Sequence, residues 1–368
     1  MKTIRLELKK RSYDIIVGSN ILGRLGRYIS KLNIGRDAYV ITNASIKNRY
    51  GNSLEKSLKQ SGLSVRFKLV PDTEESKSIE RASLIIKDLA HYDEAKRIFI
   101  VAFGGGVIGD LAGFVASVYK RGVPYLQVPT TLLAQVDSSI GGKTAVDLVE
   151  GKNLIGAFYQ PRLVLSDVKF LKTLDQRQMR SGLAEVIKYA IIKDKQLFDY
   201  LEARYKDILA RRELCLEYIV KRCSSIKVNI VSSDEREEKG IRTILNFGHT
   251  IGHAIEAAAN YKVYNHGEAI AQGMLVATEI SKALNLINPK TAQRIESLIK
   301  KVGLPVKIEK VALKDTIKAH YRDKKFAGLK NRFVLIKGIG KTKIVENVPL
   351  LIIKQAIKKL LTPHTYAV

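Results

Sequence analysis

The first half of the chain alternates short β-rich runs with stretches in which apolar residues recur at helical spacing. The runs over residues 37–43, 64–71 and 97–106 are rich in β-branched and aromatic residues, and each closes on polar residues, proline or glycine. Residues 76–92 carry apolar side chains three and four positions apart, which is the spacing of a helix. Strands and helices that alternate in this way predict a parallel sheet with both faces covered.

Beyond about residue 160 the pattern changes to long helical periodicities. These cover residues 174–194, 196–230, 247–259, 267–285, 290–302 and 311–319. Only residues 333–349 in this half look like strand. We therefore predict an α/β N-terminal domain with a parallel sheet over residues 1–160. A mainly α-helical C-terminal domain is predicted over residues 161–368.

The bulk composition is that of an ordinary globular protein. The chain has 368 residues, of which 46% are hydrophobic and 27% charged. No run of about eighteen apolar residues occurs, so we expect no membrane span. The first eighteen residues alternate like a strand, and we expect no signal peptide. Cys215 and Cys223 lie about 12 Å apart along one predicted helix, too far for a disulfide, so we expect a reduced, cytoplasmic protein.

The formal net charge of +27 comes from 63 lysines and arginines against 36 aspartates and glutamates. Such a charge could indicate nucleic-acid binding or a site for an anionic small molecule on a lysine-rich surface. The basic residues are spread along the chain, without a basic tail or interleaved aromatic residues. The sequence therefore favours a small anionic ligand, and we expect no nucleic acid as the primary partner.

A glycine-rich stretch follows the predicted strand that ends near residue 106. Gly104, Gly106 and Gly109 match G-x-G-x-x-G between a strand and a helix, where backbone N–H groups can approach a pyrophosphate. A tight turn alone could also require these glycines. The acidic residue expected about twenty positions later is missing, so a dinucleotide would not be held in the ordinary Rossmann way. Asp110 could hold a ribose or a nicotinamide amide, or could cap the helix.

Residues 128–161 combine hydroxyls, paired glycines and lysines. The polar members are Thr130, Thr131, Ser138, Ser139, Lys143 and Lys152, with Gly141 and Gly142 between them. Asp137 stands where a Walker phosphate loop would have its first glycine, which disfavours a nucleotide triphosphatase of that type. The segment predicts a small polar ligand near a sheet edge, although a serine-rich helix start would look similar.

Three histidines and one carboxylate are candidates for a metal site. Glu185 and Lys188 share a helical face in an apolar run, so they form either a surface ion pair or a buried pair that needs a further partner. Glu185 with two histidines from His249, His253 and His266 would give the open three-ligand set of catalytic zinc. His249 and His253 lie one turn apart on one helix face, and spacing alone does not choose between them.

Several motifs together resemble the 3-dehydroquinate synthase family of sugar phosphate cyclases. They are GGGVIGDLAGFVAS, RGVPYLQVPTTLLAQVDSSIGGKTAVD, GKNLIGAFYQP, GLAEVIKYAII, DEREEKGIRTILNFGHTIGHAIE, HGEAIAQGM and RDKK, in the family's order over nearly the whole chain. The resemblance implies an NAD-binding α/β domain and a helical domain with the active site between them. It also implies a homodimer and two cofactors, NAD and one Zn2+ or Co2+ ion per subunit.

The resemblance also implies roles for individual residues. It gives the metal to Glu185, His249 and His266, and catalytic roles to His253, Glu237 and Lys188, with Glu238 as the alternative to Glu237. NAD contacts fall on Asp72, Glu74, Lys77, Gly105, Gly106, Val107, Ile108, Gly109, Asp110, Thr130, Thr131, Lys152, Phe170, Leu171, Lys172 and Thr173. Substrate contacts fall on Arg121 (from across the dimer), Asp137, Lys143, Asn153, Lys227, Arg242, Asn246 and the pair Lys324 and Lys325.

The implied substrate is 3-deoxy-D-arabino-heptulosonate 7-phosphate, which carries roughly three negative charges near neutral pH. Transient oxidation by NAD, loss of phosphate, re-reduction and an intramolecular aldol reaction would give 3-dehydroquinate. The chain departs from the family at Thr73, where glycine is frequent, and at Asn43, where an acid is common. The alternatives are another sugar phosphate cyclase and a metal-dependent polyol dehydrogenase.

Overall fold

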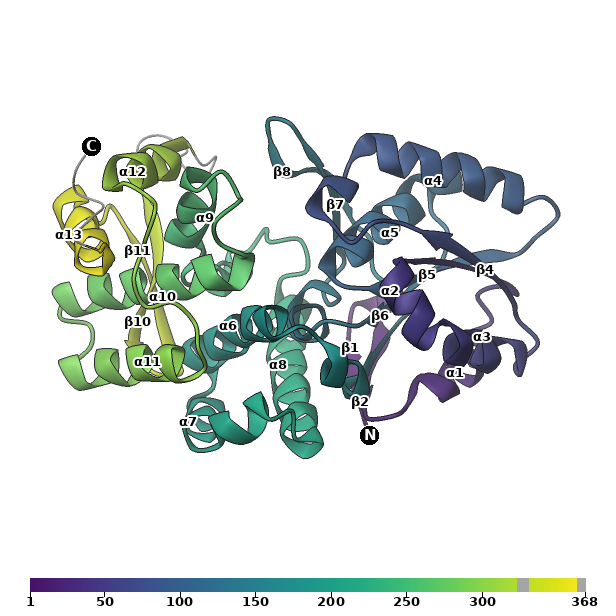
Figure 1. The fold of residues 1–368 in the computed structure, drawn as a ribbon, viewed down its shortest axis with the longest axis horizontal. Helices are drawn as coiled ribbons and strands as arrows, with labels where there is room; N and C mark the ends of the chain where they lie inside the picture. The colour runs from purple at the N-terminus through teal and green to yellow at the C-terminus, as the bar shows by residue number, and fades with distance from the viewer. Residues whose placement is uncertain (323–330, 363–368) are drawn as a thin grey trace. The chain divides into compact units, whose positions relative to one another are not determined.

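A seven-stranded sheet forms the centre of the N-terminal part of the protein (Figure 1). A computed structural model describes residues 1–322 and 331–362. The strands lie in the order β1-β2-β9-β6-β5-β3-β4, and all neighbours are parallel except β1 and β2. Their bounds are β1 Lys2–Leu6, β2 Tyr13–Gly18, β3 Asp37–Thr42, β4 Ser64–Leu69, β5 Ile98–Gly104, β6 Tyr125–Pro129 and β9 Leu163–Asp167. The predicted parallel sheet is thus confirmed.

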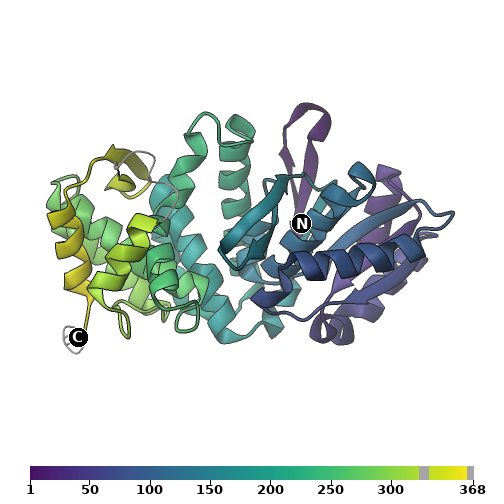
Figure 2. The same ribbon diagram turned by 90° about the horizontal axis from the view of Figure 1, so that it is seen from above.

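Helices cover both faces of this sheet (Figures 1 and 2). The helices are α1 Leu25–Leu32, α2 Ala44–Ile46, α3 Asn52–Lys59, α4 Ile79–Tyr92 and α5 Gly106–Val118. One apolar cluster joins α1 and α3 to one sheet face, and a second joins α4 and α5 to the other. The central strand β5 is buried along its whole length, as expected for a parallel strand between two helical layers.

The direction of strand addition reverses at β3. This strand pairs with β4 on one side and with β5 on the other, both in parallel. The loops after β3 and β5 therefore leave the sheet in different directions, which is the position where open α/β sheets bind ligands. Asn43 follows β3 and caps α2 by accepting a hydrogen bond from the Ile46 N–H (2.8 Å), which gives this departure from the family a local structural role.

An antiparallel hairpin, β7 Lys143–Leu148 and β8 Gly151–Phe158, precedes the last strand of the sheet. The sequence predicts a ligand-binding segment or a helix start here but no hairpin, because glycines and lysines interrupt the apolar alternation of the two strands. The first compact unit comprises Met1–Asp175 and Leu216–Arg236. It runs past the predicted boundary at residue 160 because β9 pairs with β2 and β6 inside the sheet.

The second compact unit, Gln176–Cys215 and Glu237–Val368, is mainly helical. Its described elements are α6 Gln176–Lys193, α7 Lys195–Leu209, the start of α8 Glu213–Ser233, α9 His249–Ala258, α10 His266–Ala283, α11 Pro289–Lys301, α12 Leu313–Arg322, β10 Arg332–Gly338, β11 Lys341–Glu346 and α13 Leu350–Leu360. The helix predicted over 196–230 is two helices, because the backbone at Arg211 is left-handed (φ 58°). The prediction missed α13.

Two close backbone approaches bring α6, α9 and α10 together. A Cβ atom on Gly267 of α10 would lie 2.3 Å from the Ser181 carbonyl oxygen of α6. A Cβ atom on Gly273 would lie 2.0 Å from the Gly248 carbonyl oxygen, directly before α9. Only glycine allows these helices to approach so closely. Within the described residues, no helix combines the length and apolar character needed to cross a bilayer.

Candidate active site

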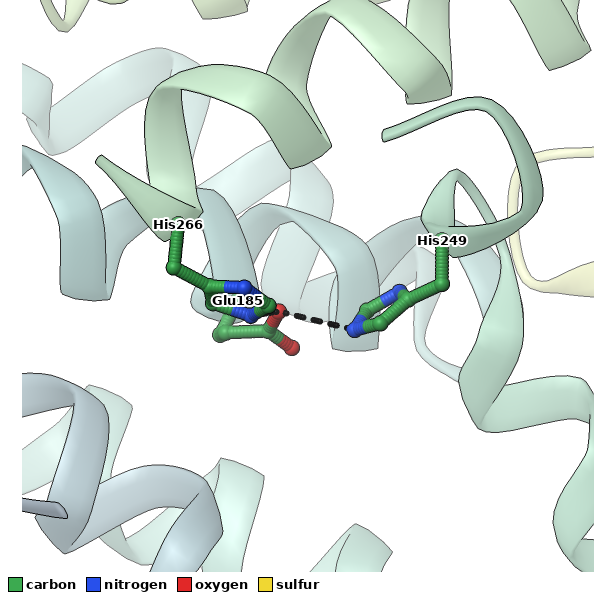
Figure 3. A group of neighbouring side chains, drawn as sticks. All are labelled: Glu185, His249 and His266. Atoms are coloured by element: carbon green, nitrogen blue, oxygen red, sulfur yellow. Dashed lines mark ion pairs between the residues drawn. The ribbon is translucent and has the colours of Figure 1, made fainter. Parts of the chain in front are cut away.

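Glu185, His249 and His266 converge in the second unit from three different helices (Figure 3). Glu185 lies in the middle of α6, while His249 and His266 are the first residues of α9 and α10. The Glu185 Oε1 atom lies 3.5 Å from His249 Nε2 and 3.4 Å from His266 Nε2. The carboxylate and the two rings point toward one another, as Figure 3 shows.

These separations suit a shared metal ion. Donor atoms bonded to a tetrahedral zinc ion at about 2.0–2.1 Å stand about 3.4 Å apart. Glu185 is fully buried, and neither of its carboxylate oxygens accepts a hydrogen bond. A buried carboxylate without hydrogen bonds needs a cation. Lys188 supplies one through its ion pair with Glu185 Oε2, and a metal ion would supply the second at Oε1.

The second nitrogen of each histidine ring is also engaged. His249 Nδ1 lies 3.2 Å from the Phe247 carbonyl oxygen, and His266 Nδ1 lies 3.6 Å from Glu256 Oε1. Both contacts leave Nε2 directed at Glu185, the arrangement in which outer partners fix the tautomer of metal-binding histidines.

The two rings differ in charge when no ion is bound. Burial, reinforced by the Lys188 ammonium, holds the pKa of His249 well below its usual value, so this imidazole is neutral. Burial also disfavours the charged form of His266, but the carboxylates of Glu185 and Glu256 outweigh it and raise the pKa of His266 to about 10. When no metal ion is bound, the proton on His266 thus supplies the positive charge that a bound cation would otherwise supply to Glu185.

The other sequence candidates in this unit flank the three ligands. The His253 ring lies one turn along α9, with its centroid 5.2 Å from that of His249 and 6.2 Å from that of His266. Arg242 is almost fully buried, and its Nε lies 3.4 Å from Glu237 Oε1. Asn246 ends the short helix η8, Ile241–Asn246, that leads into α9. Glu237, rather than Glu238, is therefore the residue in contact with a predicted substrate group.

The glycine-rich turn of the first unit has the geometry that the sequence predicted. Gly105 precedes α5 in an extended conformation, and α5 begins at Gly106. The Thr130 N–H donates to the Gly104 carbonyl (2.9 Å), and a Cβ atom on Gly105 would lie 3.1 Å from Thr131. Thr130 and Thr131 therefore line the same turn. The first backbone N–H groups of α5 have no partner within the helix and point out of its N-terminal end at this turn, which suits a phosphate.

A buried lysine joins the predicted NAD contacts to one predicted substrate contact. Lys77 donates through Nζ to Asp110 Oδ2 (2.9 Å) and to Asn153 Oδ1 (2.6 Å). Burial disfavours its charge, but the carboxylates of Asp110 and Glu74 outweigh burial and raise the pKa of Lys77. Lys152 lies 3.5 Å from Glu74 Oε1. These five residues come from three separate segments, η4 with its C-cap, α5 and β8, so the fold assembles them into one polar cluster, the Lys77 cluster.

A second pair of substrate candidates also meets in the first unit. The Lys227 ammonium of α8 forms an ion pair with Asp137 and donates to the Asp137 carbonyl (2.7 Å). Asp137 lies in the π-helical turn η6, Ala134–Ser138, and a Cβ atom on Gly106 would lie 3.3 Å from Ser138 of that turn. The pair therefore lies beside the glycine-rich turn.

For the remaining candidates within the described residues, the structure gives mainly their burial or position. Phe170 and Leu171 are buried, and Phe170 packs on Tyr50 and Phe103 in the core, so only their backbone could contact a ligand. Asp72, Arg121, Lys143, Lys172 and Thr173 are exposed. Val107 and Ile108 belong to the first turn of α5. Lys324 and Lys325 lie outside the described residues.

Two residues of the site were missed by sequence reasoning. Glu256 contacts His266, and Asp147 accepts a hydrogen bond from the Asn153 N–H (2.7 Å) and lies 3.9 Å from Lys77 Nζ. Glu256 stands three positions after His253 on the same helix face, which was the available signal. Asp147 had none, because its role depends on a left-handed backbone at Asn153 (φ 56°).

Comparison with known proteins finds matches to one enzyme family over most of the chain. Residues 67–181 match the family model described as 3-dehydroquinate synthase N-terminal, and residues 182–326 match 3-dehydroquinate synthase C-terminal. The 3-dehydroquinate synthase of Thermoanaerobacter pseudethanolicus is 45% identical over 94% of this chain and 96% of its own. That of Syntrophotalea carbinolica is 44% identical over 98% of this chain and 99% of its own.

Solved structures show the same architecture. A 2-deoxy-scyllo-inosose synthase complexed with carbaglucose-6-phosphate, NAD+ and Co2+ has a TM-score of 0.89 and 27% identity, covering 98% of this chain and 100% of its own. The 2-epi-5-epi-valiolone synthase of Streptomyces hygroscopicus, with NAD+ and Zn2+ bound, has a TM-score of 0.88 and 26% identity over 96% and 98%. An iron-containing alcohol dehydrogenase from Thermotoga maritima shares the fold alone, with a TM-score of 0.65 and 16% identity over 95% and 97%.

Proposed function

Because this chain belongs to the 3-dehydroquinate synthase family, we propose that it converts 3-deoxy-D-arabino-heptulosonate 7-phosphate into 3-dehydroquinate and phosphate. The relatives that bear this enzyme name are 44–45% identical over nearly the whole chain, whereas the inosose and valiolone synthases are 26–27% identical. The single structural observation that carries the proposal is the Glu185, His249 and His266 set, with donor separations of 3.4 and 3.5 Å.

Glu185, His249 and His266 would hold a divalent cation, Zn2+ or Co2+. When bound, such an ion supplies Lewis-acid polarisation of the substrate's hydroxyl and ketone oxygens. The chain prepares this site in two ways. The Phe247 carbonyl and the Glu256 carboxylate orient the two rings, and the Lys188 ammonium balances the second oxygen of Glu185.

His253 is the residue that we assign to proton transfer. It lies one helical turn from His249, with 5.2 Å between ring centroids, so it can exchange a proton with substrate without being a ligand. Lys188, buried beside Glu185, would donate to a substrate oxygen and favour its deprotonation. Glu237 would accept a proton, and its ion pair with Arg242 (3.4 Å) would hold its carboxylate in place.

The first unit would bind NAD at the glycine-rich turn between β5 and α5. When bound, NAD supplies the acceptor for the transient oxidation and returns the hydride, so it is regenerated. Gly105 to Asp110 would face the pyrophosphate, flanked by Thr130 and Thr131. The Lys77 cluster would orient both Asp110 and Asn153, so that one buried ammonium positions a cofactor contact and a substrate contact.

The substrate's negative charges require a cationic surrounding. Lys227, Lys143 and Arg242 would supply it from the described residues, with the pair Lys324 and Lys325 in addition. We extend the proposal to a cytoplasmic homodimer in which Arg121 of one subunit reaches the substrate phosphate of the other. Arg121 and Lys120 both have left-handed backbones (φ 63° and 48°) in an exposed turn, which suits a projecting contact.

The proposal is tested with metal-free protein supplied with NAD, a divalent ion and the heptulosonate phosphate. We expect release of phosphate and formation of 3-dehydroquinate, with no net NADH at the end of the reaction. Absence of phosphate release under these conditions would overturn the proposal. Sugar phosphates without a carboxylate serve as the control substrates, because faster turnover of these would identify a different sugar phosphate cyclase. Steady NADH accumulation with a polyol would identify a dehydrogenase.

A further inference from the structure

A second group of metal-binding side chains lies beside the proposed metal site. His253 and Glu256 lie on one face of α9, and His266 begins α10. One ligand atom from each of these residues lies within 4.8 Å of the other two. Glu256 is buried (6% exposed), and its Oε1 lies 3.6 Å from His266 Nδ1. In the mechanism proposed above, Glu256 serves only to orient the His266 ring and His253 only to move a proton, so neither is a metal ligand there.

We propose that His253, Glu256 and His266 form a second divalent-cation site, which fills when metal exceeds one ion per subunit. The set offers two imidazoles and one carboxylate, which are donors that Zn2+ and Co2+ prefer, whereas Mg2+ and Ca2+ prefer oxygen alone. His266 would be shared between the two sites through opposite nitrogens, since Nε2 lies 3.4 Å from Glu185 and Nδ1 faces Glu256.

The second ion is expected to bind more weakly than the first. A ring that binds a metal through each nitrogen must release its remaining N–H proton, and two cations held by one imidazole repel each other. The first site contains Glu185, which is fully buried and accepts no hydrogen bond, so it gains more from a cation. We therefore expect the site that contains Glu185 to fill first and the site that contains His253 to fill second.

Filling the second site has a consequence that rests on the proposed function. His253 would become a ligand and could no longer move a proton, so excess Zn2+ would inhibit turnover. The binding itself does not depend on that function. The metal stoichiometry and the activity therefore test separate proposals. Protein that binds two ions but never turns over substrate would contradict the proposed function alone. Active protein that never binds a second ion would contradict the second metal site alone.

The test is a titration of the metal-free full chain with Zn2+, read by equilibrium dialysis and metal analysis. We expect one tight and one weaker equivalent in the wild type, and loss of the weaker equivalent in His253→Ala with the tight one unchanged. His91→Ala removes an exposed histidine of α4 and should keep both equivalents. His253→Gln, checked by circular dichroism, serves if the alanine variant does not fold. A single equivalent in the wild type, or a second one that persists in a folded His253 variant, would overturn the proposal.

Discussion

His249 and His253 stand one turn apart on α9, yet their surroundings assign them different tasks. His249 Nε2 faces Glu185 Oε1 at 3.5 Å, whereas the His253 ring groups with Glu256 and His266. His249→Ala should therefore lower the affinity for Zn2+ by at least about 100-fold, because one of three protein ligands is lost. His253→Ala should keep the tight ion and lose turnover by about 10²–10⁴-fold.

Competition with a chelator measures the first effect, and phosphate release at saturating metal measures the second. Equal loss of the tight ion in both variants would show that the roles are divided wrongly. Stopped turnover in His253→Ala with normal NAD binding would place the defect in the second unit rather than in the cofactor site.

Glu256 acts on the first metal site, formed by Glu185, His249 and His266, through the His266 ring rather than by direct ligation. Its carboxylate lies 3.6 Å from His266 Nδ1 and so fixes the ring with Nε2 toward Glu185. Glu256→Gln weakens this contact, and loss of such an outer partner typically lowers metal affinity by about 10–100-fold. Glu279→Gln on α10 is the matched control, since Glu279 pairs with Lys282 and Lys359 instead. Equal metal affinity in the two variants would contradict the role of Glu256.

At the scale of elements, the metal site depends on how closely α6 and α10 approach. Ser181 and Glu185 lie one turn apart on α6, and Gly267 follows His266 on α10. Gly267→Ala would place a Cβ atom 2.3 Å from the Ser181 carbonyl oxygen, so the helices must separate. We expect a loss of about 1–3 kcal/mol in unfolding free energy and at least a tenfold loss of metal affinity.

Urea denaturation and chelator competition measure these two effects. Gly23→Ala is the control, since a Cβ atom there meets no atom within 4 Å. A Gly267→Ala variant that binds metal as tightly as Gly23→Ala would show that the close approach does not position His266.

The contact between α10 and α13 should depend on pH through Glu279. Burial favours the neutral acid, but the ammonium groups of Lys282 and Lys359 outweigh burial and lower the pKa of Glu279. A lowered folded-state pKa means that the stabilisation is present above the unfolded value of 4.5 and is lost as the pH falls through the folded value. The stability difference between wild type and Glu279→Gln should therefore shrink from about pH 7 to about pH 4. A difference that stays constant, measured by urea denaturation, would exclude this ion pair as its cause.

The elements themselves could be predicted where one sequence period dominates. The runs of β-branched and aromatic residues over 37–43 and 97–106 correctly predicted β3 and β5, and the helical spacing over 267–285 correctly predicted α10. The split between α7 and α8 could not be predicted, because a left-handed residue such as Arg211 interrupts the backbone without interrupting the apolar pattern. The hairpin of β7 and β8 was missed for the opposite reason, since glycines and charged residues hide its alternation.

At the scale of the whole molecule, the convergence of Glu185, His249 and His266 was expected from family resemblance and not from pattern. Helical periodicity places each residue on a face of its own helix, but it carries no information on which helices pack together. That packing depends on contacts such as Gly267 on Ser181 and Gly273 on Gly248, which appear in the sequence only as isolated glycines. The Lys77 cluster is similar, since its partners come from α5 and from the β7–β8 hairpin, and periodicity does not show that these elements meet.

The net charge of +27 leads to a prediction about the encounter with substrate. Positive charges spread over the chain attract a ligand with roughly three negative charges, and this attraction acts before the contacts of the site form. Salt screens it, since the Debye length falls from about 30 Å at 0.01 M to about 8 Å at 0.15 M ionic strength. We expect kcat/KM for the heptulosonate phosphate to fall several-fold over this range, while kcat at saturating substrate changes little.

Steady-state kinetics in sodium chloride measure this effect, and sucrose at equal osmolality is the control. The fall in kcat/KM should come from the association rate, so raising the solvent viscosity should slow the reaction more at low salt than at high salt. A kcat that falls in parallel with kcat/KM would instead mean that salt disturbs the site itself. An unchanged kcat/KM would mean that the charge of the surface does not act on the substrate, and that only the buried cations of the site recognise it.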